Sequence, residues 1–137
     1  MSNALYEKGR EFCLEGAIPW LTANIKVVSI DEDDDVPVLA TDDFLDDILA
    51  GAREFTSGNL ASKTSTDGVA DAADLAPAFS GAAGDTFESI TIFRDSGSAA
   101  TSELIANIDT ATGLPLTPDG GNIDITWSSA GDRIFKL

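Results

Sequence analysis

The chain has 137 residues, 43% of them hydrophobic, which is enough to build one domain with a sizeable core. Its 24 acidic residues outnumber 8 basic ones and give a formal net charge of −16. This charge argues against nucleic acid and anionic membranes as partners, because both require a basic patch. We expect a single domain over residues 1–137, with residues 1–16 as an N-terminal helical segment.

The sequence also argues against insertion into a membrane or secretion. No apolar run approaches the roughly 20 residues that span a bilayer, and the first residues carry charges without an apolar core, unlike a signal peptide. The single cysteine, Cys13, leaves no internal disulfide and does not identify a redox compartment. We therefore expect a soluble protein that is made in a cytoplasm.

Residues 3–15 predict a short helix. Ser2 or Asn3 would cap it, and Gly16 follows at the position where glycine ends many helices. Its apolar face comprises Leu5, Gly9 and Phe12, with Tyr6 and Cys13 beside them. So short a helix must gain stability by packing, either on its own domain, which we favour, or on a neighbouring subunit.

A strand is predicted over residues 24–30 and is followed directly by the acidic run DEDDD. Alternate carboxylates at Asp31, Asp33 and Asp35 could converge on a hard cation such as calcium. The spacing of an EF-hand loop is absent, however, and runs of like charge are commonly solvated loops. We therefore expect a solvated loop, and keep the three aspartates as weak metal candidates.

The next third of the chain predicts a second short helix and three strands. Thr41 would cap a helix over residues 41–48, with aspartates at its positive end. Strands are expected over 52–56, 60–66 and 68–79, with Pro77 moving the last of them to a sheet edge. Turns are expected at residues 57–59 and 67–68.

Residues 88–127 show the clearest pattern in the chain. Apolar and polar residues alternate with period two in ESITIFRD, SELIANID and NIDITW, which is typical of half-buried antiparallel strands. The predicted inward-facing residues are Ile90, Ile92, Leu104, Ile123, Ile125 and Trp127. The final RIFKL predicts a closing strand.

About eight short strands and two small helices favour an all-β fold. Strands with one apolar face need a second layer to cover them. We therefore expect an antiparallel β-sandwich, with jelly-roll-like connectivity favoured over an immunoglobulin-like one.

The residues argue against most catalytic chemistry. Without any histidine, a Ser-His-Asp triad and histidine-ligated zinc are impossible. The glycine-rich pieces lack a P-loop lysine. A carboxylate pair could hydrolyse a glycoside, but nothing marks one acid as desolvated. We expect a binding or structural module that is not an enzyme and uses no cofactor.

Nearly the whole chain resembles a family of small proteins encoded by tailed bacteriophages. The resemblance lies in NALYEKGREFCLEG, IKVVSID, ATDDFLDDI, GAREFTSGNLASKT and DGVADAAD, and continues through TIFRDSG, ATSELIANIDTATGLPLTPDGGNIDITW and RIFKL. It implies a structural component of the virion, made in the cytoplasm of a host bacterium. The DEDDD run and residues 81–85 depart from the family pattern.

Two functions follow from this resemblance. The first is a multi-copy capsid decoration, or cement, protein on the head surface, which contacts the major capsid protein and itself as a homodimer or homotrimer. The second is a tail- or fibre-associated module that could bind a receptor. For either function, the candidate partner contacts are Tyr6, Phe12, Leu14 and Trp20, because short N-terminal segments gain order by docking.

Overall fold

The computed structural model describes residues 3–131 and 133–137, which form three antiparallel sheets, one α-helix and short 3₁₀ helices. The strands are β1 (Ala4–Leu5), β2 (Ile25–Ile30), β3 (Arg53–Thr56), β4 (Val69–Ala70), β5 (Leu75–Phe79), β6 (Ser89–Arg94), β7 (Leu104–Ile108), β8 (Ile123–Ile125) and β9 (Phe135–Lys136). The helix α1 spans Glu7–Leu14, and the 3₁₀ helices are Leu45–Asp47, Ala50–Ala52, Thr66–Gly68 and Ala99–Thr101.

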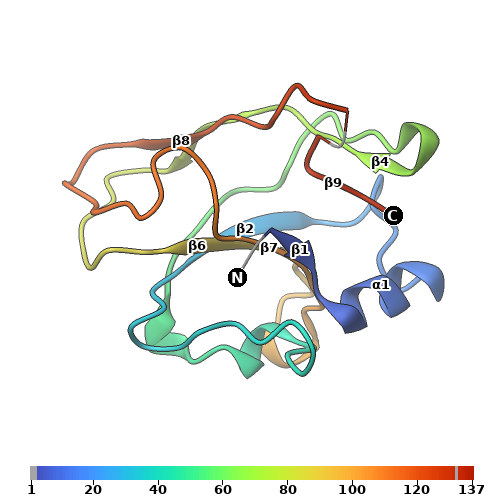
Figure 1. Cartoon of the computed structure of the whole chain (residues 1–137), viewed down its shortest axis with the longest axis horizontal. Helices are drawn as coiled ribbons and strands as arrows, with labels where there is room; N and C mark the ends of the chain where they lie inside the picture. The colour runs from blue at the N-terminus through green and yellow to red at the C-terminus, as the bar shows by residue number, and fades with distance from the viewer. Residues whose placement is uncertain (1–2, 132) are drawn as a thin grey trace.

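The largest sheet has five strands in the order β1-β7-β6-β2-β3. In Figure 1 the pairs β5–β8 and β4–β9 lie above this sheet, while α1 and the segment between β2 and β3 lie below it. The five-stranded sheet is therefore covered on both faces.

The three inner strands, β7, β6 and β2, are consequently buried on both faces. In β6, Ile90 and Ile92 pack in one apolar cluster, whereas Phe93 packs in a second cluster with Val28 and Leu104. The expectation of half-buried strands is wrong for β6 and β7, because the alternation there separates two buried faces rather than a buried face from a wet one.

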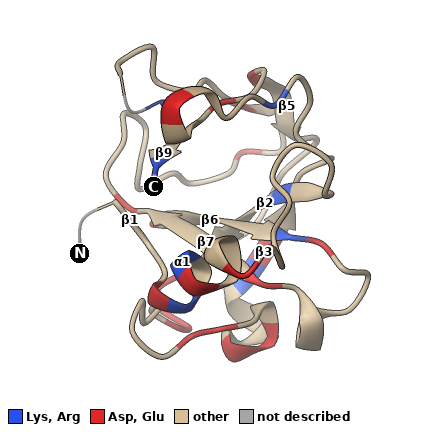
Figure 2. Cartoon of the chain, turned by 90° about the vertical axis from the view of Figure 1, so that its right-hand side faces the viewer, with Lys and Arg blue, Asp and Glu red and all other residues tan. Residues whose placement is uncertain are grey.

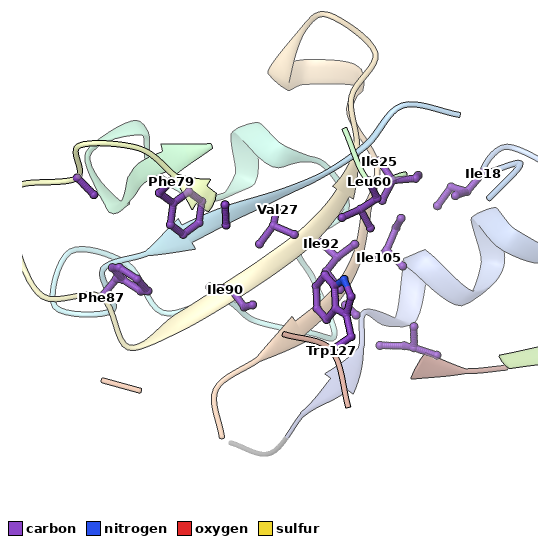
Figure 3. Close-up of a cluster of buried hydrophobic side chains, with 14 residues drawn as sticks. Ile18, Ile25, Val27, Leu60, Phe79, Phe87, Ile90, Ile92, Ile105 and Trp127 are labelled. Atoms are coloured by element: carbon purple, nitrogen blue, oxygen red, sulfur yellow. The ribbon is translucent and has the colours of Figure 1, made fainter. Parts of the chain in front are cut away.

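The third strand of the 88–127 stretch belongs to a different layer. β8 pairs with β5, with Leu75 opposite Ile125 and Phe79 opposite Ile123. Trp127 then packs with Ile90 and Ile92 in the larger cluster, shown in Figure 3. Ile123 and Ile125 are only half-buried against that cluster, and Leu104, predicted on the same inward face, packs in the second cluster. The predicted inward face is therefore only partly correct.

The N-terminal segment is a strand followed by a helix. Ala4 and Leu5 pair with β7, and α1 begins only at Glu7 with no side-chain cap. The predicted start is therefore wrong: the Asn3 side chain instead accepts hydrogen bonds from the backbone N–H of Asp109 and Thr110, and Ser2 lies outside the described residues. The predicted end is confirmed, because Gly16 follows the helix at φ +80°.

Three other expected elements differ from those in the structure. Thr41 caps no helix; the Asp47 carboxylate instead accepts bonds from two backbone N–H groups before the 3₁₀ helix Leu45–Asp47. Residues 60–66 form no strand, since Leu60 bonds to Ile25 and the positive φ of Ser62 then breaks the extended path. Residues 68–79 divide into β4 and β5.

The coarse fold is thus confirmed: the described chain is mostly β, with antiparallel sheets of five, two and two strands. The edge position expected for Pro77 is also confirmed, since β5 pairs only with β8 among the described strands. The strand order does not show jelly-roll connectivity: the sheets have five, two and two strands, and in the largest of them β6 lies between β7 and β2.

Candidate functional site

Asp31 stands at the centre of a group of carboxylates at the end of β2. Its side chain is buried, and its carboxylate oxygens lie within 4.8 Å of those of Glu54 and Asp85 in one triad, and of Asp33 and Glu88 in another. β2 pairs with both β3 and β6, and this pairing brings Glu54 and Glu88 beside the start of the acidic run.

Hydrogen bonds and charge repulsion both act on this carboxylate group. Asp31 accepts a bond from the Asp33 backbone N–H at 3.0 Å, and Glu88 accepts one from the Glu32 N–H at 2.8 Å. Burial, followed by repulsion from Asp85 and Asp31, raises the pKa of Glu54 above its ordinary value. An all-oxygen donor set suits a hard cation, yet backbone N–H groups already occupy two of the carboxylates.

The structure therefore brings together two of the three predicted metal candidates. Asp35 lies apart from both triads, and its carboxylate accepts a 2.8 Å hydrogen bond from the Leu49 N–H. Sequence reasoning missed Glu54, Asp85 and Glu88, which come from distant parts of the chain. The available signal was the antiparallel pairing of the strands that Asp31 and Glu88 flank.

Tyr6 cannot serve as a partner contact in this fold. Its side chain is fully buried, and its hydroxyl shares a 2.9 Å hydrogen bond with the hydroxyl of Thr91. Burial, partly offset by that bond, raises the pKa of the phenol well above its usual range. The prediction for Tyr6 is wrong because the N-terminal segment is part of the chain's own core.

The other three predicted contacts lie near the C-terminal end of α1. Phe12 is half-buried, with its ring 5.5 Å from that of Phe44. Trp20 packs edge-on against Phe135 at 5.2 Å and donates a hydrogen bond from Nε1 to the Thr64 carbonyl. Leu14 is 86% exposed.

An apolar hollow of about 130 Å³ lies beside Trp20 and Phe135. It is lined in part by Cys13, Ile18, Trp20, Ala70, Phe135 and Leu137. Leu14, Leu21 and Leu137 are exposed apolar residues. We call Leu14, Trp20, Leu21 and Leu137 the apolar end.

Cys13 is the lone thiol, and burial raises its pKa, so it is a poor nucleophile. Among residues 3–131 and 133–137, no helix is long and apolar enough to cross a membrane. Searches found neither a family model nor a curated protein that matches this chain.

Proposed function

We propose that this protein is a non-enzymatic structural component of a tailed-phage virion, carried in many copies as a capsid decoration protein on the head surface. Its partners would be the major capsid protein and further copies of itself. The resemblance over nearly the whole chain supports a location in the virion. As part of the same proposal, the fold would be a jelly-roll-like β-sandwich.

The apolar end is the observation that carries the docking part of the proposal. A side chain such as Leu14, at 86% exposure, gains free energy only when a partner covers it. Contacts of this kind, small in each copy, add up across a lattice of binding sites. The charge of −16 keeps copies soluble until they dock.

The amount of protein in purified virions tests the location. A quantitative gel should show hundreds of copies per particle, as expected for a protein that covers a head. Six or fewer copies per particle, confined to isolated tails, would favour the tail- or fibre-associated module instead. Absence from virions would exclude both.

A point variant tests the docking surface. Leu14→Asp should fold normally but decorate purified shells about tenfold more weakly or worse, because it places a charge in the contact. Ala83→Asp adds the same charge at an exposed site near Asp119 and should decorate as the parent does. Equal decoration by both variants would remove the apolar end from the proposal.

A further inference from the structure

An open cleft of about 510 Å³ runs between the edge of the five-stranded sheet and the last strand. β1 and β7 form one wall and β9 the other. Three of the chain's eight basic residues line it, Arg10, Arg133 and Lys136. No described lining residue is acidic. We call this hollow the basic cleft.

The cations of the basic cleft are largely unpaired. Arg133 has one long contact to Asp71, at 3.9 Å, while Arg10 and Lys136 form no ion pair with another described residue. The same cleft contains apolar surface from Leu5, Ile108 and Ile134. An occupant should therefore offer both carboxylates and apolar side chains.

Residues 31–38, which directly follow β2 and which we call the acidic segment, carry that combination. Asp33 and Asp34 are exposed, and Val36 and Val38 are 50% and 48% exposed on either side of the buried Pro37. Figure 2 shows acidic stretches both below and above the five-stranded sheet, and a basic stretch at β9.

The acidic segment is held in one conformation by its own chain. Asp35 accepts a bond from the Leu49 N–H, the Val38 N–H donates to Asp42, and the Leu39 carbonyl accepts from the Glu7 N–H, all at 2.8–2.9 Å. A segment that is already ordered loses little conformational entropy when it docks.

We propose that the acidic segment of one copy docks in the basic cleft of a second copy. The acidic segment follows β2, whereas the basic cleft lies at the β1–β7 edge and reaches Arg10 of α1. Two different surfaces therefore meet, and each contact is head-to-tail. Repeated contacts of this kind close into a ring when the rotation permits. This inference rests on the proposed function, in which the protein contacts further copies of itself, and it specifies the surfaces of that contact.

The net charge opposes association only at long range. Between exposed charges, repulsion is screened over about 8 Å at physiological salt, whereas carboxylates seated among Arg10, Arg133 and Lys136 lie in direct contact. The contact also lowers the local excess of like charge on each copy. Attraction between the charges in contact therefore outweighs the screened repulsion between the charges elsewhere on the two copies.

Sedimentation equilibrium of the parent protein, from about 1 µM to about 1 mM at 0.15 M salt, is the first test. We expect concentration-dependent association. A parent chain that stays monomeric throughout overturns the inference, even when it still decorates shells. Association by a chain absent from virions would instead overturn only the proposed function.

Charge reversal then identifies the two surfaces. A cleft variant, Arg10→Glu with Lys136→Glu, and a segment variant, Asp33→Lys with Asp34→Lys, should each self-associate about tenfold more weakly or worse. All four side chains are exposed, and circular dichroism checks that both variants fold. Mixed together, the two variants should recover association, because the reversed cleft then meets the reversed segment.

Matched controls separate this contact from net charge. Lys8→Glu, on another side of α1 from Arg10, and Glu15→Lys reverse charges outside both surfaces and should associate as the parent does. Lys8 is half-buried and Glu15 is exposed. Val36→Asn with Val38→Asn should weaken association with no change of charge. The inference is overturned if the mixed variants do not recover association, or if the control variants lose as much association as the cleft and segment variants.

Discussion

Tyr6 shows how one side chain decides the role of the N-terminal segment. It joins Thr91 and Asn107 in a buried polar network beneath the five-stranded sheet, where the Asn107 amide donates to the Thr91 hydroxyl at 3.0 Å. The sequence pattern placed Tyr6 on the helix beside its apolar stripe, whereas Tyr6 precedes α1 and packs in the second cluster. The pattern could not show that the hydroxyl had a partner 85 residues away.

Tyr6 is the only tyrosine, so its titration can be followed by absorbance at about 295 nm. Burial raises its folded pKa above the unfolded value near 10, so the folded state holds the phenol proton more tightly. The resulting stability is complete below pH about 10 and is lost as pH rises further. We expect tyrosinate absorbance to appear only together with unfolding.

A relocated phenol is the control for this titration. In Tyr6→Phe with Leu14→Tyr, the sole phenol moves to the most exposed apolar position and should titrate near 10 while the chain remains folded. Parent absorbance that rises near pH 10 without loss of structure would show that Tyr6 is not buried.

Gly9 is the second residue whose role depends on packing. A Cβ there would lie 2.6 Å from the Leu104 carbonyl oxygen and 2.9 Å from that of Ile105, both backbone atoms of β7. Gly9→Ala should therefore destabilise the fold by about 1–3 kcal/mol through overpacking, despite the better helix propensity of alanine. Urea unfolding measures the loss.

Gly58→Ala is the matched control, because nothing lies within 4 Å of the added methyl. It should change the free energy of unfolding by less than about 0.5 kcal/mol. Equal stability of the Gly9 and Gly58 variants would mean that α1 does not pack closely on β7.

At the scale of elements, period-two alternation located strands well but did not assign them to sheets. The predicted strands at 24–30, 52–56 and 88–95 correspond to β2, β3 and β6 within two residues. The pattern in β8 looks the same as that in β6, yet β8 joins a two-stranded sheet. Sheet membership depends on long-range pairing, which alternation within a strand does not encode.

The carboxylate group around Asp31 could be predicted only in part from the sequence, for the same reason. The acidic run was obvious from the sequence, but Glu54, Asp85 and Glu88 join it only because β3 and β6 flank β2. Conversely, Asp35 lies in the run and is turned away to bond Leu49. Neighbours in sequence predicted only part of this cluster, since pairing of strands supplied the rest.

Core depth separates two isoleucines that the sequence treats alike. Ile92 is fully buried in β6, so Ile92→Ala should lower the free energy of unfolding by about 2–5 kcal/mol. Ile125 is half-buried in the three-residue β8, so Ile125→Ala should lower the free energy of unfolding by about 1 kcal/mol. The loss is smaller because this side chain buries less apolar surface on folding and the short strand can relax around the change. Equal losses in urea unfolding would mean that β8 is packed as deeply as β6.

At the scale of the whole molecule, the surplus of acidic side chains sets the response to salt. The 24 acidic residues face only 8 basic ones, and the described ion pairs are few, with Arg94–Glu103 the least exposed of them. Repulsion among like charges raises the energy of the compact state more than that of the expanded chain. Screening should therefore stabilise this fold.

We expect the midpoint of thermal unfolding to rise when sodium chloride increases from about 0.02 M to about 0.5 M, over which the screening length falls severalfold. The measurement belongs at the lowest usable protein concentration, so that self-association does not add its own stabilisation. Arg94→Met with Glu103→Leu, which removes the least exposed of the described ion pairs, should show a slightly larger rise, because salt weakens that pair in the parent. A midpoint that falls with salt would mean that attractive ion pairs, rather than repulsion, dominate the electrostatics of the folded chain.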